Sequence, residues 1–191
     1  MIEETALPDV KVITPRWFGD DRGAFCETYN GATLKKHGID DVFQQDNHSI
    51  SAAVGTVRGL HFQSQPHGQA KLVRVVVGAI YDVAVDIRAG SPAYGRWVGE
   101  LLSAENGKQL YVPEGFAHGF VTQAPNTEVL YKCTGLYAPA HEGSIRFDDP
   151  DLAIDWGIDP KDAILSAKDD AAPSFGALDS PFPYAASKVA T

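Results

Sequence analysis

The chain has 191 residues, of which 44% are hydrophobic, and a formal net charge of −9 at neutral pH. That length and apolar content fit one globular domain with a sizeable core, and they exclude a disordered chain. The acidic balance argues against a protein that binds nucleic acid or an acidic membrane, because such surfaces need an excess of basic residues.

The start of the chain, residues 1–10 ("MIEETALPDV"), has neither a basic segment nor an apolar signal core. No hydrophobic stretch is long enough to span a bilayer, so we expect a cytoplasmic protein without membrane contacts. Cys26 and Cys133 are the only cysteines. They are too few for a disulfide framework or a thiolate zinc site, and we expect both to be reduced packing residues.

Residues 57–74, "VRGLHFQSQPHGQAKLVR", are typical of two strands joined by a loop. Arg58 and His61 stand among apolar residues, and Lys71 stands directly before an apolar run. A solvated hairpin would explain the charges but not this order, since charge set inside apolar sequence is costly. Strict alternation puts Arg58 and His61 on opposite faces, so a bulge at Gly59 is needed to aim both at one pocket.

Residues 80–88, "IYDVAVDIR", alternate in the manner of a strand. The residues Val83, Val85 and Ile87 share one face, and Asp82, Ala84 and Asp86 share the other. The same pattern, separated by turns rich in Gly, Pro, Asn and Ser, predicts further strands within residues 71–78, 97–103, 108–115, 119–123 and 128–137.

Helical signal is sparse. Asn30 can cap a short helix that ends at Gly38, and residues 166–172 can form a second one. Many closely spaced strands with few helices predict an all-β class with a closed or double-sheet architecture such as a jelly roll. We find no repeat or linker, so we expect one domain over residues 1–191, with a loosely ordered tail from about residue 180.

Residues 110–120, "LYVPEGFAHGF", place His118 between two small residues that leave room for a ligand. A lone histidine is more often structural. The pattern Pro-x-Gly-x-x-His resembles the second motif of cupin barrels. Metal-binding cupins add a His-x-His and a Glu, whereas this sequence offers only His61 at the comparable place, so we expect a cupin-like barrel without metal. Acid–base chemistry then falls to His61, Lys71 and Tyr131, although Tyr131 alone also fits a core aromatic.

Several blocks, taken in order over about residues 8–170, resemble the dTDP-4-dehydrorhamnose 3,5-epimerase family. These blocks are "FGDDRGAFCETYN", "QQDNHSIS", "VRGLHFQ", "KLVRVVVGAIYDVAVDIRAGSPAYG", "VPEGFAHGF", "YKCTGLYAP" and "LSAKD". The resemblance implies a cupin-type double-stranded β-helix and a homodimer that exchanges N-terminal strands. It also implies a dTDP-4-keto-6-deoxyhexose substrate, inverted at the third and fifth ring carbons for L-rhamnose synthesis, and no metal or organic cofactor.

By this resemblance four residues carry the chemistry. His61 matches the base, and Asp169 matches the carboxylate that orients it and raises its affinity for a proton. Lys71 matches the cation beside the carbonyl oxygen, where negative charge grows in the transition state. Tyr131 matches the acid that returns a proton on the opposite face of the ring, which inverts the carbon centre.

The other matched residues are expected to bind substrate. Arg22 and Glu27 match nucleotide contacts, Arg58 matches a bidentate ligand of the diphosphate, and Tyr137 matches an aromatic that stacks on thymine. Further contacts to the sugar or nucleotide are implied for Gln45, Asp46, Asn47, His118, Glu142 and Lys168. Taken singly, the charged residues fit an ordinary surface and residues 45–47 an ordinary turn, so only their joint placement indicates a site. His67 is expected to be a loop residue.

Two alternatives stay open at this stage. Relatives that invert one carbon only keep the same His and Tyr, so a 3- or 5-mono-epimerase of a related dTDP-4-keto-deoxysugar fits the same residues. A cupin that binds a sugar nucleotide without catalysis is the other alternative, although it has no need for His, Asp, Lys and Tyr together.

Overall fold

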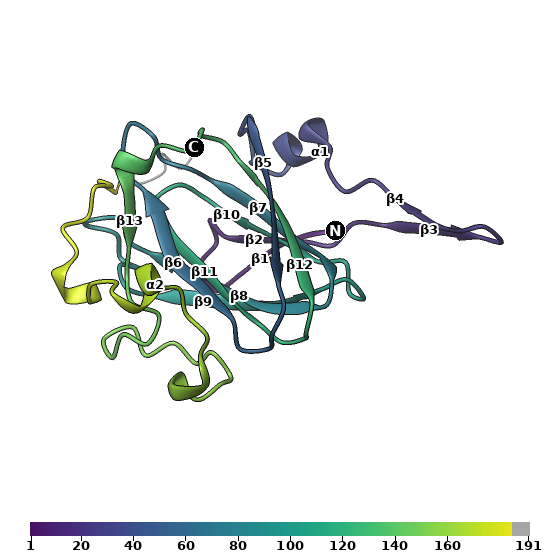
Figure 1. The fold of residues 1–191 in the computed structure, drawn as a ribbon. Helices are drawn as coiled ribbons and strands as arrows, with labels where there is room; N and C mark the ends of the chain where they lie inside the picture. Colours follow the sequence, from purple (N-terminus) through teal and green to yellow (C-terminus); the bar gives the residue numbers. More distant parts are fainter. Residues whose placement is uncertain (185–191) are drawn as a thin grey trace.

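The computed structural model describes residues 1–184 and is built mainly from two antiparallel sheets (Figure 1). The six-stranded sheet has the order β1 (Ile2–Glu4), β2 (Lys11–Ile13), β10 (Gln109–Val112), β7 (Lys71–Val77), β12 (Thr127–Cys133) and β5 (Gln45–Ser51). The five-stranded sheet has the order β13 (Glu142–Ser144), β6 (Val57–Gln63), β11 (Phe116–Thr122), β8 (Ala79–Asp86) and β9 (Trp97–Ser103). This arrangement confirms the predicted all-β jelly-roll class.

The main core lies between the two sheets. Its side chains come from alternate positions of strands in both, which is how a two-sheet fold buries apolar surface. The other face of the five-stranded sheet is also covered, because Val83 and Val85 of β8 pack in one cluster with Phe147 and Trp156 from the C-terminal part. Strand β8 is therefore apolar on both faces, and any polar residue on its inner face needs a partner.

The helices are short. Helix α1 (Gly31–Lys36) is capped by Asn30, whose side chain accepts a hydrogen bond of 3.1 Å from the backbone N–H of Thr33. Gly38 follows with φ of +81°, a left-handed conformation that suits glycine at a helix end. Helix α2 (Ala167–Asp170) is capped by Ser166. Both predicted helices are confirmed, and three 3₁₀ turns complete the set within residues 1–184: η1 (Pro139–His141), η2 (Pro160–Asp162) and η3 (Phe175–Ala177).

Every segment predicted as a strand from its alternation overlaps a strand of the structure, namely β7, β8, β9, β10, β11 and β12. Strands β6 and β7 enclose the expected loop but belong to different sheets, so the solvated hairpin is excluded. Residues 45–47 begin β5 and form no turn. Alternation did not predict strands β1, β2, β5 and β13 or the two strands within residues 17–26, and β1, β2 and β13 have only three residues each.

A separate hairpin, β3 (Trp17–Asp20) and β4 (Gly23–Cys26), projects from the body (Figure 1). Its aromatic residues are exposed, and Phe25 keeps 69% of its surface accessible. Strands β1 and β2 pair with each other and with β10 of the same chain.

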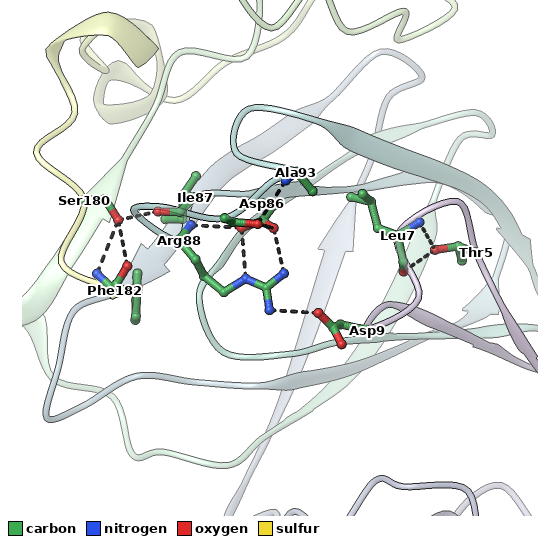
Figure 2. Close-up of polar contacts among 10 residues, drawn as sticks. Thr5, Leu7, Asp9, Asp86, Ile87, Arg88, Ala93, Ser180 and Phe182 are labelled. Atoms are coloured by element: carbon green, nitrogen blue, oxygen red, sulfur yellow. Dashed lines mark hydrogen bonds and ion pairs between the residues drawn. The ribbon is translucent and has the colours of Figure 1, made fainter. Parts of the chain in front are cut away.

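The predicted loosely ordered tail does not begin at residue 180. Phe182 is buried, its backbone N–H donates a hydrogen bond to the Ser180 hydroxyl, and that hydroxyl donates to the carbonyl of Ile87 (Figure 2). Because an apolar side chain is buried here, this part of the prediction is wrong for residues 180–184. The rest of it, residues 185–191, lies outside the described part of the chain.

The end of β8 is tied to the N-terminal segment by ion pairs. Arg88 contacts Asp86 at 2.6 Å and Asp9 at 2.8 Å (Figure 2). The Asp86 side chain is fully buried, and hydrogen bonds from Arg88 and Ser91 outweigh the effect of burial, so its pKa lies below the usual range. Among residues 1–184, no helix is long and apolar enough to cross a membrane.

Candidate active site

Two adjoining cavities lie where the sheets meet. The histidine cavity, of about 250 Å³, is lined by Ser49, Arg58, His61, Lys71, His118, Phe120, Tyr131, Ser166, Lys168 and Asp169. The Glu142 cavity, of about 330 Å³, is lined by Gln45, Asn47, His61, Phe62, Gln63, Gln69, Lys71, Tyr131, Cys133, Tyr137 and Glu142. They share His61, Lys71 and Tyr131, so they form two parts of one cleft.

A bulge in β6 brings Arg58 and His61 to the same cavity, as predicted. Arg58 lies opposite Phe120 of β11, and His61 lies opposite His118, so β6 uses one residue more than β11 between these pairs. Gly59 sits in the bulge with φ of +123°. A Cβ there would lie 2.6 Å from the Cα of Gly119, which explains why this position holds glycine.

His61 is paired with a buried carboxylate. Its Nε2 lies 2.6 Å from Oδ1 of Asp169, whose other oxygen accepts a 2.8 Å hydrogen bond from Ser166. Burial alone would raise the pKa of Asp169, but the bonds from His61 and Ser166 hold it below the usual value. An ionised carboxylate can only accept, so Nε2 carries the hydrogen and Nδ1 is left as the basic nitrogen.

Lys71 faces His61 from the six-stranded sheet. Burial lowers its pKa, and the negative charges of Asp82 and Glu142 offset part of that effect. Lys71 lines both cavities, and its ammonium has no hydrogen-bond partner among residues 1–184. The arrangement provides a partly desolvated cation that is ready to contact an oxygen atom of a ligand.

Tyr131 lies on β12 of the same sheet as Lys71, opposite Asn47 in register. Burial raises the pKa of its hydroxyl, which therefore keeps its proton at neutral pH and can donate it. The side chain also packs against the main core. Tyr131 is thus both a packing residue and a part of the cavity wall, and it comes from the sheet that does not carry His61.

The Glu142 cavity holds several of the predicted binding residues in one hydrogen-bonded group. Gln45 accepts from the backbone N–H of Tyr137 at 2.9 Å, and the Tyr137 hydroxyl donates to Glu142 at 3.1 Å. Lys168 contacts the other oxygen of Glu142 at 2.5 Å, and bonds from Lys168 and Tyr137 lower the Glu142 pKa although burial opposes this. Tyr137 is 59% exposed, so its ring is accessible to a planar ligand.

Arg58 is held by two hydrogen bonds of 3.2 Å, to the Ser51 hydroxyl and the Ile50 carbonyl. Its guanidinium has five donors, so groups remain for an anion in the histidine cavity. His67 lies in a loop, and its ring contacts that of His141 at a tilt of 50° with centroids 4.4 Å apart.

Three predicted residues do not reach either cavity of their own chain. Asp46 points to the opposite face of β5 and pairs with Lys132 at 2.9 Å, because neighbours along a strand alternate. Arg22 is 90% exposed at the tip of the hairpin and pairs with Asp20. Glu27 follows β4 and accepts a 3.1 Å hydrogen bond from Asn30.

Two residues beside the site were not predicted from the sequence. Asp82 lies 2.7 Å from His118 and is fully buried. Ser49 lines the histidine cavity, and its hydroxyl is buried without a hydrogen-bond partner within residues 1–184. The signal for Asp82 was its place beside Ala84 on a strand that is apolar on both faces. No comparable signal marks Ser49.

Comparison with known proteins gives a consistent set of matches. The family model described as dTDP-4-dehydrorhamnose 3,5-epimerase matches residues 4–177. A protein of that name from Sinorhizobium fredii is 48% identical over 184 residues, covering 95% of this chain and 93% of its own. One from Salmonella typhimurium is 51% identical over 174 residues, covering 91% and 94%. The crystal structure of an epimerase from Legionella pneumophila, in complex with dTDP-4-keto-L-rhamnose, superposes with a TM-score of 0.92 at 46% identity, covering 97% and 99%.

Proposed function

Because the chain belongs to the dTDP-4-dehydrorhamnose 3,5-epimerase family, we propose that it inverts dTDP-4-dehydro-6-deoxy-D-glucose at the third and fifth ring carbons to give dTDP-4-dehydro-L-rhamnose. One observation carries the proposal. A single cavity is lined by residues from both sheets. On the five-stranded side are the base His61 and its carboxylate Asp169, and on the six-stranded side are the protonated Tyr131 and the desolvated Lys71.

The reaction begins with removal of a proton next to the ketone. The carbonyl at the fourth carbon acidifies the hydrogens on the third and fifth carbons, because the electron pair left behind spreads onto the carbonyl oxygen. The bare Nδ1 of His61 accepts the proton, and the imidazolium that forms is balanced by the Asp169 carboxylate 2.6 Å from its Nε2.

The negative charge then grows on the carbonyl oxygen. Lys71 supplies the matching positive charge from a buried position, where electrostatic stabilisation is stronger than in water. This role needs no metal ion. Among residues 1–184, no three His, Cys, Asp or Glu side chains converge as a metal site.

Tyr131 completes the inversion. Its hydroxyl donates a proton to the carbon from the wall opposite His61, the carbonyl re-forms, and the centre is inverted. The tyrosinate and the imidazolium then exchange protons with solvent, which returns both residues to their starting states. Proton removal and return on opposite ring faces give inversion at each centre.

The thymine of the substrate fits the Glu142 cavity and its rim, and the diphosphate lies by Arg58 in the adjoining histidine cavity. Tyr137 offers an open ring to the thymine, and Arg58 offers remaining N–H groups to the diphosphate. Gln45, Asn47, His118, Glu142 and Lys168 complete the contacts from the same chain. Asp46 faces away and is left out of the set.

We propose a homodimer in which the β3–β4 hairpin of each subunit reaches the cleft of its partner. The projection of the hairpin, its exposed aromatic residues, and the exposure of Arg22 at its tip support this (Figure 1). Arg22 and Glu27 would then serve the partner's cleft. A cytoplasmic location belongs to the same proposal, because the two free cysteines suit a reducing compartment.

Deuterium incorporation tests the function directly. Turnover in D₂O, followed by NMR of the recovered sugar nucleotide, should show deuterium at both the third and the fifth carbon. Incorporation at one carbon only would identify a mono-epimerase. No incorporation at either carbon would leave a protein that binds the sugar nucleotide without reacting.

A further inference from the structure

A second histidine–carboxylate pair lies in the wall of the histidine cavity. The Nε2 atom of His118 is 2.7 Å from Oδ1 of Asp82, and their side chains are only 7% and 0% exposed. In the register of the sheet, His118 of β11 lies opposite both His61 of β6 and Ala84 of β8. Asp82 is two residues before Ala84 and therefore lies on the same face of β8. The two histidines of the cavity are therefore neighbours, and each has its own carboxylate.

The partner of His118 decides which ring nitrogen carries the hydrogen. A carboxylate only accepts hydrogen bonds, so the hydrogen lies on Nε2. Burial lowers the pKa of His118, Asp82 opposes this, and the nearby charge of Lys71 lowers it further, so the net pKa is below the ordinary value and the ring is neutral at neutral pH. The other nitrogen, Nδ1, is then a hydrogen-bond acceptor.

His118 lines the histidine cavity, so this acceptor is available to a ligand bound there. Nδ1 has no hydrogen-bond partner within residues 1–184. Only two side-chain polar atoms in that range are both fully buried and without a partner, and Nδ1 is not one of them, so it is not fully buried. Those two atoms are the Ser49 hydroxyl and Oδ2 of Asp82. An unpaired buried carboxylate oxygen is costly, and the nearby cation of Lys71 offsets part of that cost.

We infer that Asp82 is a positioning residue that makes His118 an acceptor for a ring hydroxyl of the sugar. The negative charge of Asp82 also favours the charged form of Lys71, which donates to the ketone. The cavity then holds one acceptor and one donor side by side. A ring turned the wrong way would set its carbonyl against the bare Nδ1, which repels it. Asp82 thereby helps to select the orientation in which the ketone meets Lys71. The identification of the ligand as a ketosugar rests on the proposed function.

The first test is spectroscopic and needs no substrate. Nitrogen-15 NMR of the ring nitrogens of His118, assigned by their loss in His118→Gln, should show a neutral Nε2–H form in the parent protein at neutral pH. An Nδ1–H form or an imidazolium would overturn the inference, whether or not the protein is an epimerase. This measurement also stands if the variants below do not fold.

The second test uses Asp82→Asn with Asp169→Asn as a matched control at the other pair. An amide can donate to Nε2, so Asp82→Asn should shift His118 towards the Nδ1–H form, whereas Asp169→Asn should leave its signals unchanged. The shifted ring offers a donor to the sugar hydroxyl. We expect kcat/KM to fall by about tenfold to a hundredfold, the effect of a mismatched buried hydrogen bond. A folded Asp82→Asn protein with an unchanged His118 tautomer, or with a changed tautomer and the parent kcat/KM, would refute the role of Asp82.

Discussion

Replacing Gly59 with alanine tests the link between the bulge and the chemistry. The new Cβ would lie 2.6 Å from the Cα of Gly119 and 2.7 Å from the carbonyl oxygen of His118, both backbone atoms that cannot move aside. Overpacking of this kind costs about 1–3 kcal/mol. A non-glycine residue at φ of +123° adds strain of about 1–3 kcal/mol. The free energy of unfolding should therefore fall by about 2–6 kcal/mol, a large part of the stability of a typical domain.

The protein can relieve this strain by losing the bulge. A regular register would put Leu60 opposite His118 and turn His61 to the other face of the sheet, because neighbours along a strand alternate. Any folded Gly59→Ala protein should then show almost no exchange of substrate hydrogens in D₂O.

Gly90→Ala is the matched control for Gly59→Ala. Gly90 also has a positive φ, of +84°, but no atom lies within 4 Å of its Cβ position. Denaturant unfolding should show a loss of only about 1–2 kcal/mol there, with exchange at the parent rate. If Gly59→Ala unfolds at the same denaturant concentration as Gly90→Ala and exchanges hydrogen normally, the argument from the bulge is wrong.

Four further predictions follow from the site. Tyr131→Phe should still exchange hydrogen with solvent at the carbon nearer the base but yield little inverted product, with a rate loss of about a hundredfold to ten-thousandfold, whereas His61→Asn should do neither; epimerisation by Tyr131→Phe at the parent rate would return Tyr131 to a packing role. Mixing Arg22→Ala subunits with His61→Asn subunits should restore part of the activity, and no recovery in mixed dimers would count against hairpin exchange. Exhaustive chelation should leave turnover intact; a loss reversed by zinc, iron or manganese would contradict the acid–base reading. Folding lowers the pKa of Asp169, so its contribution to stability is fully present above the ordinary pKa and is lost as pH falls from that value through the lowered pKa of the folded state. In denaturant titrations, the stability of Asp169→Asn should therefore depend less on acid pH than that of the parent.

Local signals in the sequence predicted much of this fold. Alternation identified β8, and Asn30 with Gly38 identified α1, because strand period and helix caps depend on neighbouring residues only. The bulge at Gly59 was also predictable, since Arg58 and His61 could share a pocket in no other way.

The remaining features depend on contacts between distant parts of the chain. The strand β5 is polar on the face that lines the cleft, so "QDNHSIS" has no apolar alternation to mark it. Once β5 is known to be a strand, its period of two explains why Gln45 and Asn47 face the cleft while Asp46 does not. The pairing of Asp82 with His118 follows from the register of β8 against β11, which residues 36 positions apart do not reveal in sequence.

The two-sheet architecture itself supplies the geometry of inversion. Facing sheets pack about 10 Å apart, which leaves room for a sugar ring between side chains that reach in from both sides. His61 comes from one sheet, and Lys71 and Tyr131 come from the other, so under the proposed roles the base and the acid reach a bound ring from different sheets. The third and fifth carbons are related by the ketone that lies between them. If Lys71 holds the carbonyl oxygen as a pivot, a turn of the ring about the carbonyl axis exchanges these two carbons before the same base. One base and one acid are then enough for two inversions, and the number of centres inverted depends on how freely the ring turns about that axis.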